Sequence, residues 1–111
     1  MNKTHRPWGH YEVLLDHPQY KVKRIVVDPY QKFSLQYHNH RSEHWVVVEG
    51  GGKIVLDGSE YSADPNTFWY VPEKSIHRAE ANGDGLVLIE TQIGNCYEED
   101  IIRIQDDYDR A

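Results

Sequence analysis

Short apolar or alternating segments recur along the chain, and turn-forming residues separate each segment from the next. The segments are rich in Val, Ile, Tyr and Trp, which favour β-strands. Asp-Pro, Asp-Gly and Gly-rich sequences between them are typical of turns. The expected strands are Tyr11–Leu15, Tyr20–Val27, Phe33–His38, Trp45–Val48, Lys53–Leu56, Thr67–Val71, His77–Ala81 and Leu86–Gln92. This pattern predicts an all-β antiparallel sandwich or barrel, with a jelly roll as the leading version.

Helical periodicity is weak throughout the sequence. Only the segment Tyr97–Tyr108 could form a short helix, and its apolar spacing does not distinguish a helix from a strand. The chain has 111 residues, which is the size of one ordinary domain. We therefore predict a single domain over residues 1–111.

Composition limits the partners and the chemistry. The formal net charge of −6 argues against nucleic acid or a membrane surface as the main partner, although a local group of cations can still bind a phosphorylated small molecule. Cys96 is the only cysteine, so an internal disulfide is impossible. The sequence shows neither an apolar leader nor a long apolar run, and we expect a cytoplasmic location. Metal ligands must then be histidines and carboxylates.

Histidines and a glutamate are concentrated in the segment Gln36–Trp45. His38 and His40 share a face if this segment is a strand, and a tight turn could bring the Glu43 carboxylate back over them. His77 follows a Pro-containing turn and begins another expected strand. Imidazole and carboxylate ligands suit Zn²⁺, Mn²⁺, Fe²⁺, Co²⁺ or Ni²⁺. Spacing alone leaves metal binding and ordinary packing as alternatives for this cluster.

The order of these residues resembles the two motifs of the cupin superfamily. His-x-His, Glu, six residues and Gly form the first motif, and Pro, four residues and His form the second. The matching residues are His38, His40, Glu43, Gly50, Pro72 and His77. The resemblance implies a double-stranded β-helix, or jelly-roll, barrel with one divalent metal ion on the three histidines and Glu43. The isolated His5, His10 and His17 are expected to be packing or surface residues.

A more specific resemblance extends from Arg6 to Arg110. Its centre is His-Arg-Ser-Glu-His-Trp at His40–Trp45, which resembles the type II mannose-6-phosphate isomerase domain. The other matching segments are Arg6–Gly9, Ser34–Trp45, Val71–Pro72, His77–Glu80, Ile89–Gly94, Glu99–Arg103 and Asp107–Arg110. In that family the domain usually follows a mannose-1-phosphate guanylyltransferase. The Gly-rich nucleotide loop of that partner is absent from this sequence, so nucleotidyl transfer is not expected.

The resemblance implies interconversion of mannose 6-phosphate and fructose 6-phosphate through an enediol(ate). A divalent metal would stabilise the developing negative charge on oxygen. The base must be an inward-facing carboxylate or histidine, for which Glu90 and His44 are the candidates. Glu90 could instead pair with an arginine, and His44 is expected on the opposite face of its strand from Glu43. The candidate substrate-binding residues are Arg41, Lys74, Arg78, Arg103 and Gln36.

Some assignments stay open at this point. Gln36 shares a face with His38 and His40, so it could bind the metal or hydrogen-bond to a metal ligand. The three tryptophans are expected in the core or an interface rather than as platforms for sugar; they are Trp8, Trp45 and Trp69. We also expect a homodimer, because a small jelly roll must cover its sheet edges.

Two residues depart from the family pattern and keep other functions open. Tyr30 stands where the family usually has Gly after Pro29, and Lys74 replaces the Gly of the second cupin motif. Lys74 implies either a relaxed turn or a new positive group near the site. One alternative function is a metal-binding cupin that acts on another small molecule, including Fe²⁺-dependent oxygenation. The other alternative is a non-catalytic sugar-binding module.

Overall fold

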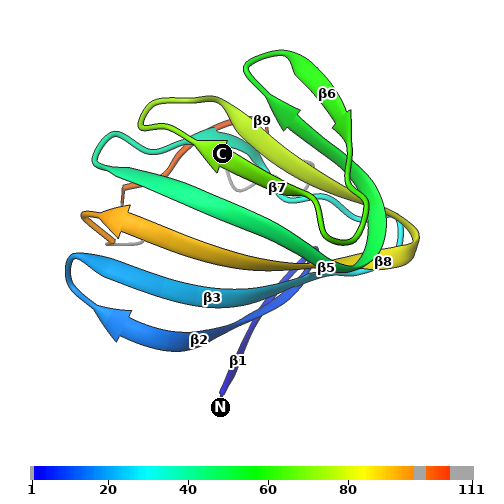
Figure 1. The fold of residues 1–111 in the computed structure, drawn as a ribbon, viewed down its shortest axis with the longest axis horizontal. Helices are drawn as coiled ribbons and strands as arrows, with labels where there is room; N and C mark the ends of the chain where they lie inside the picture. Colours follow the sequence, from blue (N-terminus) through cyan, green and yellow to red (C-terminus); the bar gives the residue numbers. More distant parts are fainter. Residues whose placement is uncertain (1, 97–99, 106–111) are drawn as a thin grey trace.

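The computed structural model describes residues 2–96 and 100–105, and all helical or extended elements assigned within these ranges are β-strands. The strands are β1 (Lys3–Arg6), β2 (Gly9–His17), β3 (Tyr20–Val27), β4 (Leu35–Tyr37), β5 (Arg41–Leu56), β6 (Ser59–Ser62), β7 (Phe68–Val71), β8 (His77–Gly94) and β9 (Ile102–Gln105). The predicted all-β double-stranded β-helix is confirmed (Figure 1). The described residues contain no helical segment with the length and hydrophobicity of a membrane span.

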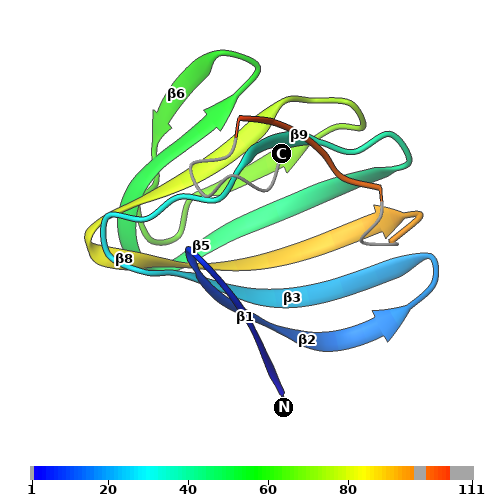
Figure 2. The same cartoon turned by 180° about the vertical axis from the view of Figure 1, so that it is seen from behind.

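The antiparallel strands form two layers that face each other. One layer contains β1, β2, β3, the second half of β8, the first half of β5, and β7, in that order. The other contains β6, the second half of β5, the first half of β8, β4 and β9. In both views the sheet curls upward from β2 toward β6 and β9 (Figure 1, Figure 2). The buried apolar side chains fill the space between the layers.

The long strands β5 and β8 each pass through both layers. The sequence predicted that Gly50–Gly52 and Asn82–Gly85 are turns between separate strands, whereas each is a corner inside one continuous strand. A Cβ atom on Gly50 would lie 2.0 Å from the carbonyl oxygen of Gly85, and one on Gly52 would lie 1.9 Å from another β8 carbonyl oxygen. Because the two backbones touch where they bend together, these positions exclude a side chain.

Shorter elements differ from the prediction as well. β1 and β6 were not predicted, and β4 contains only three residues of the expected strand Phe33–His38. Ile102–Gln105, which lies in the segment considered for a short helix, is strand β9 and pairs with β4. Apart from 100–105, the rest of that segment lies outside the described residues. The local apolar spacing of this segment did not distinguish a helix from a strand, and its pairing with β4 makes it a strand.

Inward-facing side chains change from apolar to polar along the barrel. Three successive rows across β3, β8 and β5 contain Ile25, Leu88 and Val47; then Lys23, Glu90 and Trp45; then Gln92 and Glu43. All eight side chains are buried. Burying charged groups is costly unless they are paired. The polar rows therefore identify one end of the barrel interior as the place where a functional site is built.

The two positions that depart from the family pattern both have a left-handed backbone. The φ angle is +62° at Tyr30 and +65° at Lys74, a region that favours glycine. The turn at Lys74 is therefore not relaxed. Its N–H donates to the carbonyl oxygen of His38 at 2.7 Å, so this strained turn also holds one of the candidate metal ligands.

Replacing Lys74 by glycine should raise the free energy of unfolding by roughly 0.5–1 kcal/mol. The change removes about 1–2 kcal/mol of left-handed strain and loses about 0.5–1 kcal/mol to the greater freedom of glycine in the unfolded chain. Urea unfolding measures the difference. Lys74→Ala is the matched control, because it removes the same side chain and keeps the strain. Equal stability of the two variants would contradict the prediction.

Candidate active site

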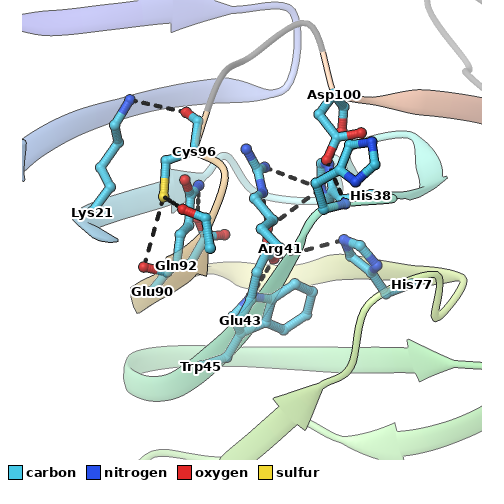
Figure 3. A network of polar contacts seen from close by, with 12 residues as sticks. Lys21, His38, Arg41, Glu43, Trp45, His77, Glu90, Gln92, Cys96 and Asp100 are labelled. Carbon is cyan, nitrogen blue, oxygen red and sulfur yellow. Dashed lines mark hydrogen bonds and ion pairs between the residues drawn. The ribbon is translucent and has the colours of Figure 1, made fainter. Parts of the chain in front are cut away.

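Three buried side chains from different elements converge at the polar end of the barrel. His38 follows β4, Glu43 lies in β5, and His77 begins β8. One ligand atom from each residue lies within 4.8 Å of the others. His38 Nε2 is 3.3 Å from Glu43 Oε2, and His77 Nε2 is 3.7 Å from Glu43 Oε1. The structure thus brings together three of the four ligands predicted from the sequence (Figure 3).

The two imidazole rings are oriented by backbone carbonyl groups. His38 Nδ1 lies 2.5 Å from the Asp100 carbonyl oxygen, and His77 Nδ1 lies 2.8 Å from the Ser75 carbonyl oxygen. A carbonyl oxygen can only accept, so Nδ1 carries a proton in both rings, and the Nε2 atoms are the ones that face Glu43. His77 Nε2 is buried without a hydrogen-bond partner among the described residues. Such orientation is typical of metal-binding histidines, and this donor set fits a divalent cation.

Charge within the group keeps the ligands in the form that binds a metal. Burial opposes ionisation of Glu43, yet electrostatic interactions with His77 and Arg41 more than offset it and lower the pKa of Glu43 to about 2. Burial lowers the pKa of His38 to about 4, and Arg41 acts in the same direction, whereas Glu43 opposes the shift. At neutral pH the Glu43 carboxylate is therefore charged and the His38 ring is neutral.

A pocket adjoins this group inside the barrel and is rich in cations. Its charged and amide lining consists of Arg6, Lys23, Arg41, Arg103, Glu90, Gln36 and Gln92. Trp8, Tyr11 and Phe33 supply aromatic walls. Arg41 belongs to both places, because it lines the pocket and also contacts His38 and Glu43. Four cations and one glutamate create a positive pocket on a chain that is acidic overall, which suits a small anion.

Glu90 is the carboxylate that faces this pocket. It accepts a short hydrogen bond from Gln92 Nε2 and lies opposite Lys23 on the neighbouring strand. Burial raises its pKa to about 7, the negative charge of Glu43 adds to the shift, and Lys23 opposes it. A buried carboxyl group that titrates near neutral pH can both take and return a proton.

The stability gained by replacing Glu90 with glutamine should increase as the pH rises from about 4.5 to about 7. The pKa of Glu90 is about 7 in the folded protein against 4.5 for the ordinary group. Between these values the folded protein keeps a proton that the unfolded chain releases, so each pH unit destabilises the wild type by up to ~1.4 kcal/mol. The effect is absent below this window and constant above it.

Urea unfolding of both metal-free proteins at several pH values tests this expectation. The comparison between variants is essential because the lowered pKa of His38 destabilises both proteins as the pH falls from 6.5 toward 4. A stability difference that does not change with pH would contradict the assignment.

Several residues predicted from the sequence lie outside the site. His40 is exposed, because β4 ends at Tyr37 and the chain bends before the strand alternation could turn its ring inward. The backbone N–H groups of residues 39 and 40 donate to the Asp100 carboxylate and hold this bend. His44 is exposed on the outer face of β5, where its ring lies 4.9 Å from that of Tyr70.

The cationic side chains predicted to bind substrate do not all lie at the pocket. Arg41 and Arg103 line the pocket. Lys74 is exposed and is not part of the pocket lining. Arg78 is buried and donates to the carbonyl oxygens of Phe33 and Gln105 at 2.8 and 3.0 Å. Arg78 therefore fastens β9 to the barrel. Gln36 lines the pocket and accepts a hydrogen bond from Ser34 Oγ at 2.7 Å.

The sequence patterns did not select three residues that the structure places at the site, namely Lys23, Arg6 and Asp100. Lys23 alternates with the apolar Ile25 and Val27 in a predicted strand, a signal that it faces inward. Its ammonium group lies 4.2 Å from the centre of the Tyr11 ring, a cation–π contact. Arg6 and Asp100 carried no comparable signal, since they reach the site only through the packing of the two ends of the described chain.

The fold and the His38, Glu43 and His77 group together define a cupin. The chain belongs to the mannose-6-phosphate isomerase C-terminal family, whose profile matches residues 1–106. It is 41% identical over 111 residues to a mannose-1-phosphate guanylyltransferase of Escherichia coli, covering 98% of this chain and 23% of that protein. It is 38% identical over 111 residues to the alginate biosynthesis protein AlgA of Pseudomonas aeruginosa, with coverages of 98% and 23%. The chain thus spans less than a quarter of these curated relatives.

Solved structures resemble this one in fold. An RmlC-like cupin from Shewanella frigidimarina superposes with a TM-score of 0.79 at 22% identity, covering 88% of this chain and 86% of that chain. At this level of identity the similarity shows the shared cupin architecture alone.

Proposed function

We propose that this chain is a metal-dependent aldose–ketose isomerase that interconverts mannose 6-phosphate and fructose 6-phosphate. The observation that carries the proposal is a pocket lined by one glutamate and several cations, which shares Arg41 with the group of potential metal ligands. The reaction needs a base, an anion-binding region and stabilisation of charge on oxygen. Membership of the mannose-6-phosphate isomerase C-terminal family supports the choice of substrate.

The potential metal ligands and the residues that line the pocket have different roles in this proposal. His38, Glu43 and His77 would hold a divalent cation, which supplies Lewis-acid stabilisation of the substrate oxygens when bound. Glu90 takes the proton from C2 of mannose 6-phosphate and returns it to C1, while the proton of the C2 hydroxyl group passes to the C1 oxygen through the enediol(ate). The hydrogen bond with Gln92 fixes the Glu90 carboxyl group. Arg103, Arg6 and Lys23 bind the phosphate, since guanidinium groups can donate two hydrogen bonds to its oxygens.

The direct test follows the sugar phosphates by NMR. Protein loaded with a divalent cation is mixed with mannose 6-phosphate carrying ¹³C at C1, and the label should appear in fructose 6-phosphate. In D₂O the product should gain deuterium at C1 if the proton exchanges with solvent during transfer. No conversion with any of Zn²⁺, Mn²⁺, Fe²⁺, Co²⁺ or Ni²⁺ would refute the proposal.

Replacing Arg103 by methionine should raise the KM for mannose 6-phosphate about 10-fold or more and change kcat less. Arg103 lines the pocket from β9, and its Nε is buried without a hydrogen-bond partner among the described residues. A charge-assisted bond to phosphate contributes about 1.5–3 kcal/mol to binding. Steady-state kinetics measures both constants. A loss confined to kcat would instead place Arg103 at the reacting atoms.

The ligand set favours one second candidate function. Two histidines and one carboxylate are also the donors of non-haem Fe²⁺ oxygenases, and the structure leaves His40 out of the group. The iron-loaded protein would then consume oxygen in the presence of a small-molecule substrate. Metal analysis of the purified protein together with an oxygen electrode distinguishes this function from isomerisation.

A further inference from the structure

Arg41 contacts two of the three potential metal ligands. Its Nε donates to Glu43 Oε2 at 3.0 Å, and its Nη2 lies 3.1 Å from His38 Nε2. All three side chains are buried, with exposed fractions of 5% for Arg41 and 2% for each of the other two. In Figure 3 the Arg41 side chain extends past Glu43 toward His38. The guanidinium group therefore uses the same atoms that would bind a cation.

The two uses of these atoms exclude each other. A lone pair on His38 Nε2 that accepts a hydrogen bond from Arg41 is not available to a metal. Arginine stays protonated at every relevant pH, so it cannot yield by losing its proton and must move. In the arrangement seen here its charge compensates the buried Glu43 carboxylate, which would otherwise be very costly to bury.

We propose that Arg41 is the counter-ion of the metal-free site and exchanges with the metal ion. When a divalent cation binds His38, Glu43 and His77, Arg41 releases its two contacts and its guanidinium group turns to the adjoining pocket. Arg41 already lines that pocket, as Arg103 and Lys23 do. There it becomes a ligand for the anion, so the metal site and the anion pocket are coupled through one side chain. This proposal rests on the metal site and anion pocket of the proposed function.

The exchange predicts a change in solvent access at Arg41 Nε–H. The resonance of this group is identified in the ¹H–¹⁵N spectrum of the wild type by its absence from Arg41→Lys. In metal-free protein the buried bond to Glu43 should make its hydrogen exchange slow. One equivalent of Zn²⁺ should shift the ring resonances of His38 and His77 and speed exchange at Arg41 at least about 10-fold. Unchanged exchange at Arg41, or histidine resonances that do not shift, would overturn the proposal.

Calorimetry with Zn²⁺ tests whether the competition depends on contact. Arg41→Met should bind Zn²⁺ more tightly than the wild type by about 10-fold or more, because no hydrogen bonds to the ligands must break. Arg103→Met is the matched control, since it removes the same charge from the same pocket without a contact to His38 or Glu43. Equal gains in the two variants would show general electrostatics and would overturn the proposal. Thermal unfolding confirms that both variants are folded.

Sulfate titrations test the coupling without any sugar or turnover. Arg41→Met should weaken sulfate binding little in the metal-free protein, because Arg41 is then engaged by Glu43 and His38. In the zinc-loaded protein the same substitution should weaken sulfate binding by about 5-fold or more. Direct contact of sulfate with zinc is common to both proteins and cancels in the comparison. Equal losses with and without zinc would overturn the coupling, whatever the isomerase assay shows.

Discussion

Replacing His77 by alanine should abolish stoichiometric binding of a divalent cation and reduce the proposed isomerase activity at least about 1,000-fold. His77 provides one of three donors, and His38 and Glu43 alone cannot satisfy a cation that prefers at least three protein ligands at a catalytic site. Its Nε2 is buried without a hydrogen-bond partner among the described residues, so this nitrogen is the atom left to bind a cation. Calorimetry with Zn²⁺ or Co²⁺ measures the binding.

His40→Ala is the matched control for this experiment. His40 was predicted as a ligand from the His-x-His spacing, yet its side chain is exposed and outside the group. Its substitution should leave the affinity for the cation within about 2-fold of the wild type. Circular dichroism and thermal unfolding should show that His77→Ala is folded, although it loses the ring contact with Trp45 and the hydrogen bond to the Ser75 carbonyl oxygen. Equal losses in the two variants would mean that the cation recruits His40 by rearranging the bend.

The sequence was sufficient to predict the all-β class because alternation and β-branched residues are local signals. The corners of β5 and β8 were not predictable in the same way. Gly50–Gly52 has the composition of a turn, and only the touching backbone of β8 makes it a bend within one strand. Strand pairing across the barrel depends on the whole fold, so it cannot be predicted from the local sequence pattern.

For the site, too, some residues could be predicted from local sequence patterns, whereas others depend on the whole fold. The spacing of His38, Glu43 and His77 was enough to select three residues that converge. His40 was selected by the same strand rule and lies apart because the strand ends three residues earlier. The contacts that complete the site, such as the Asp100 carbonyl group on His38, join residues 62 apart in the chain. No short-range pattern encodes such a contact.

Replacing Glu90 by glutamine should lower kcat for isomerisation by about 100- to 10,000-fold while leaving cation binding intact. Glutamine has nearly the same shape and its Oε1 can still accept the hydrogen bond from Gln92. It cannot take a proton, and a positioned base contributes roughly this factor to the rate. The exchange of deuterium into the product should disappear together with the conversion of substrate.

Glu80→Gln provides the control on the same strand. Glu80 lies in the first half of β8 and forms ion pairs with Lys32 and Lys53 at 3.8 and 3.5 Å, away from the pocket lining. This variant should keep kcat within about 2-fold of the wild type. If Glu90→Gln kept its activity while His77→Ala lost it, the proton would have to move through another group. Because Glu90 is the one carboxylate that lines the pocket among the described residues, that result would contradict the assignment of Glu90 as the base.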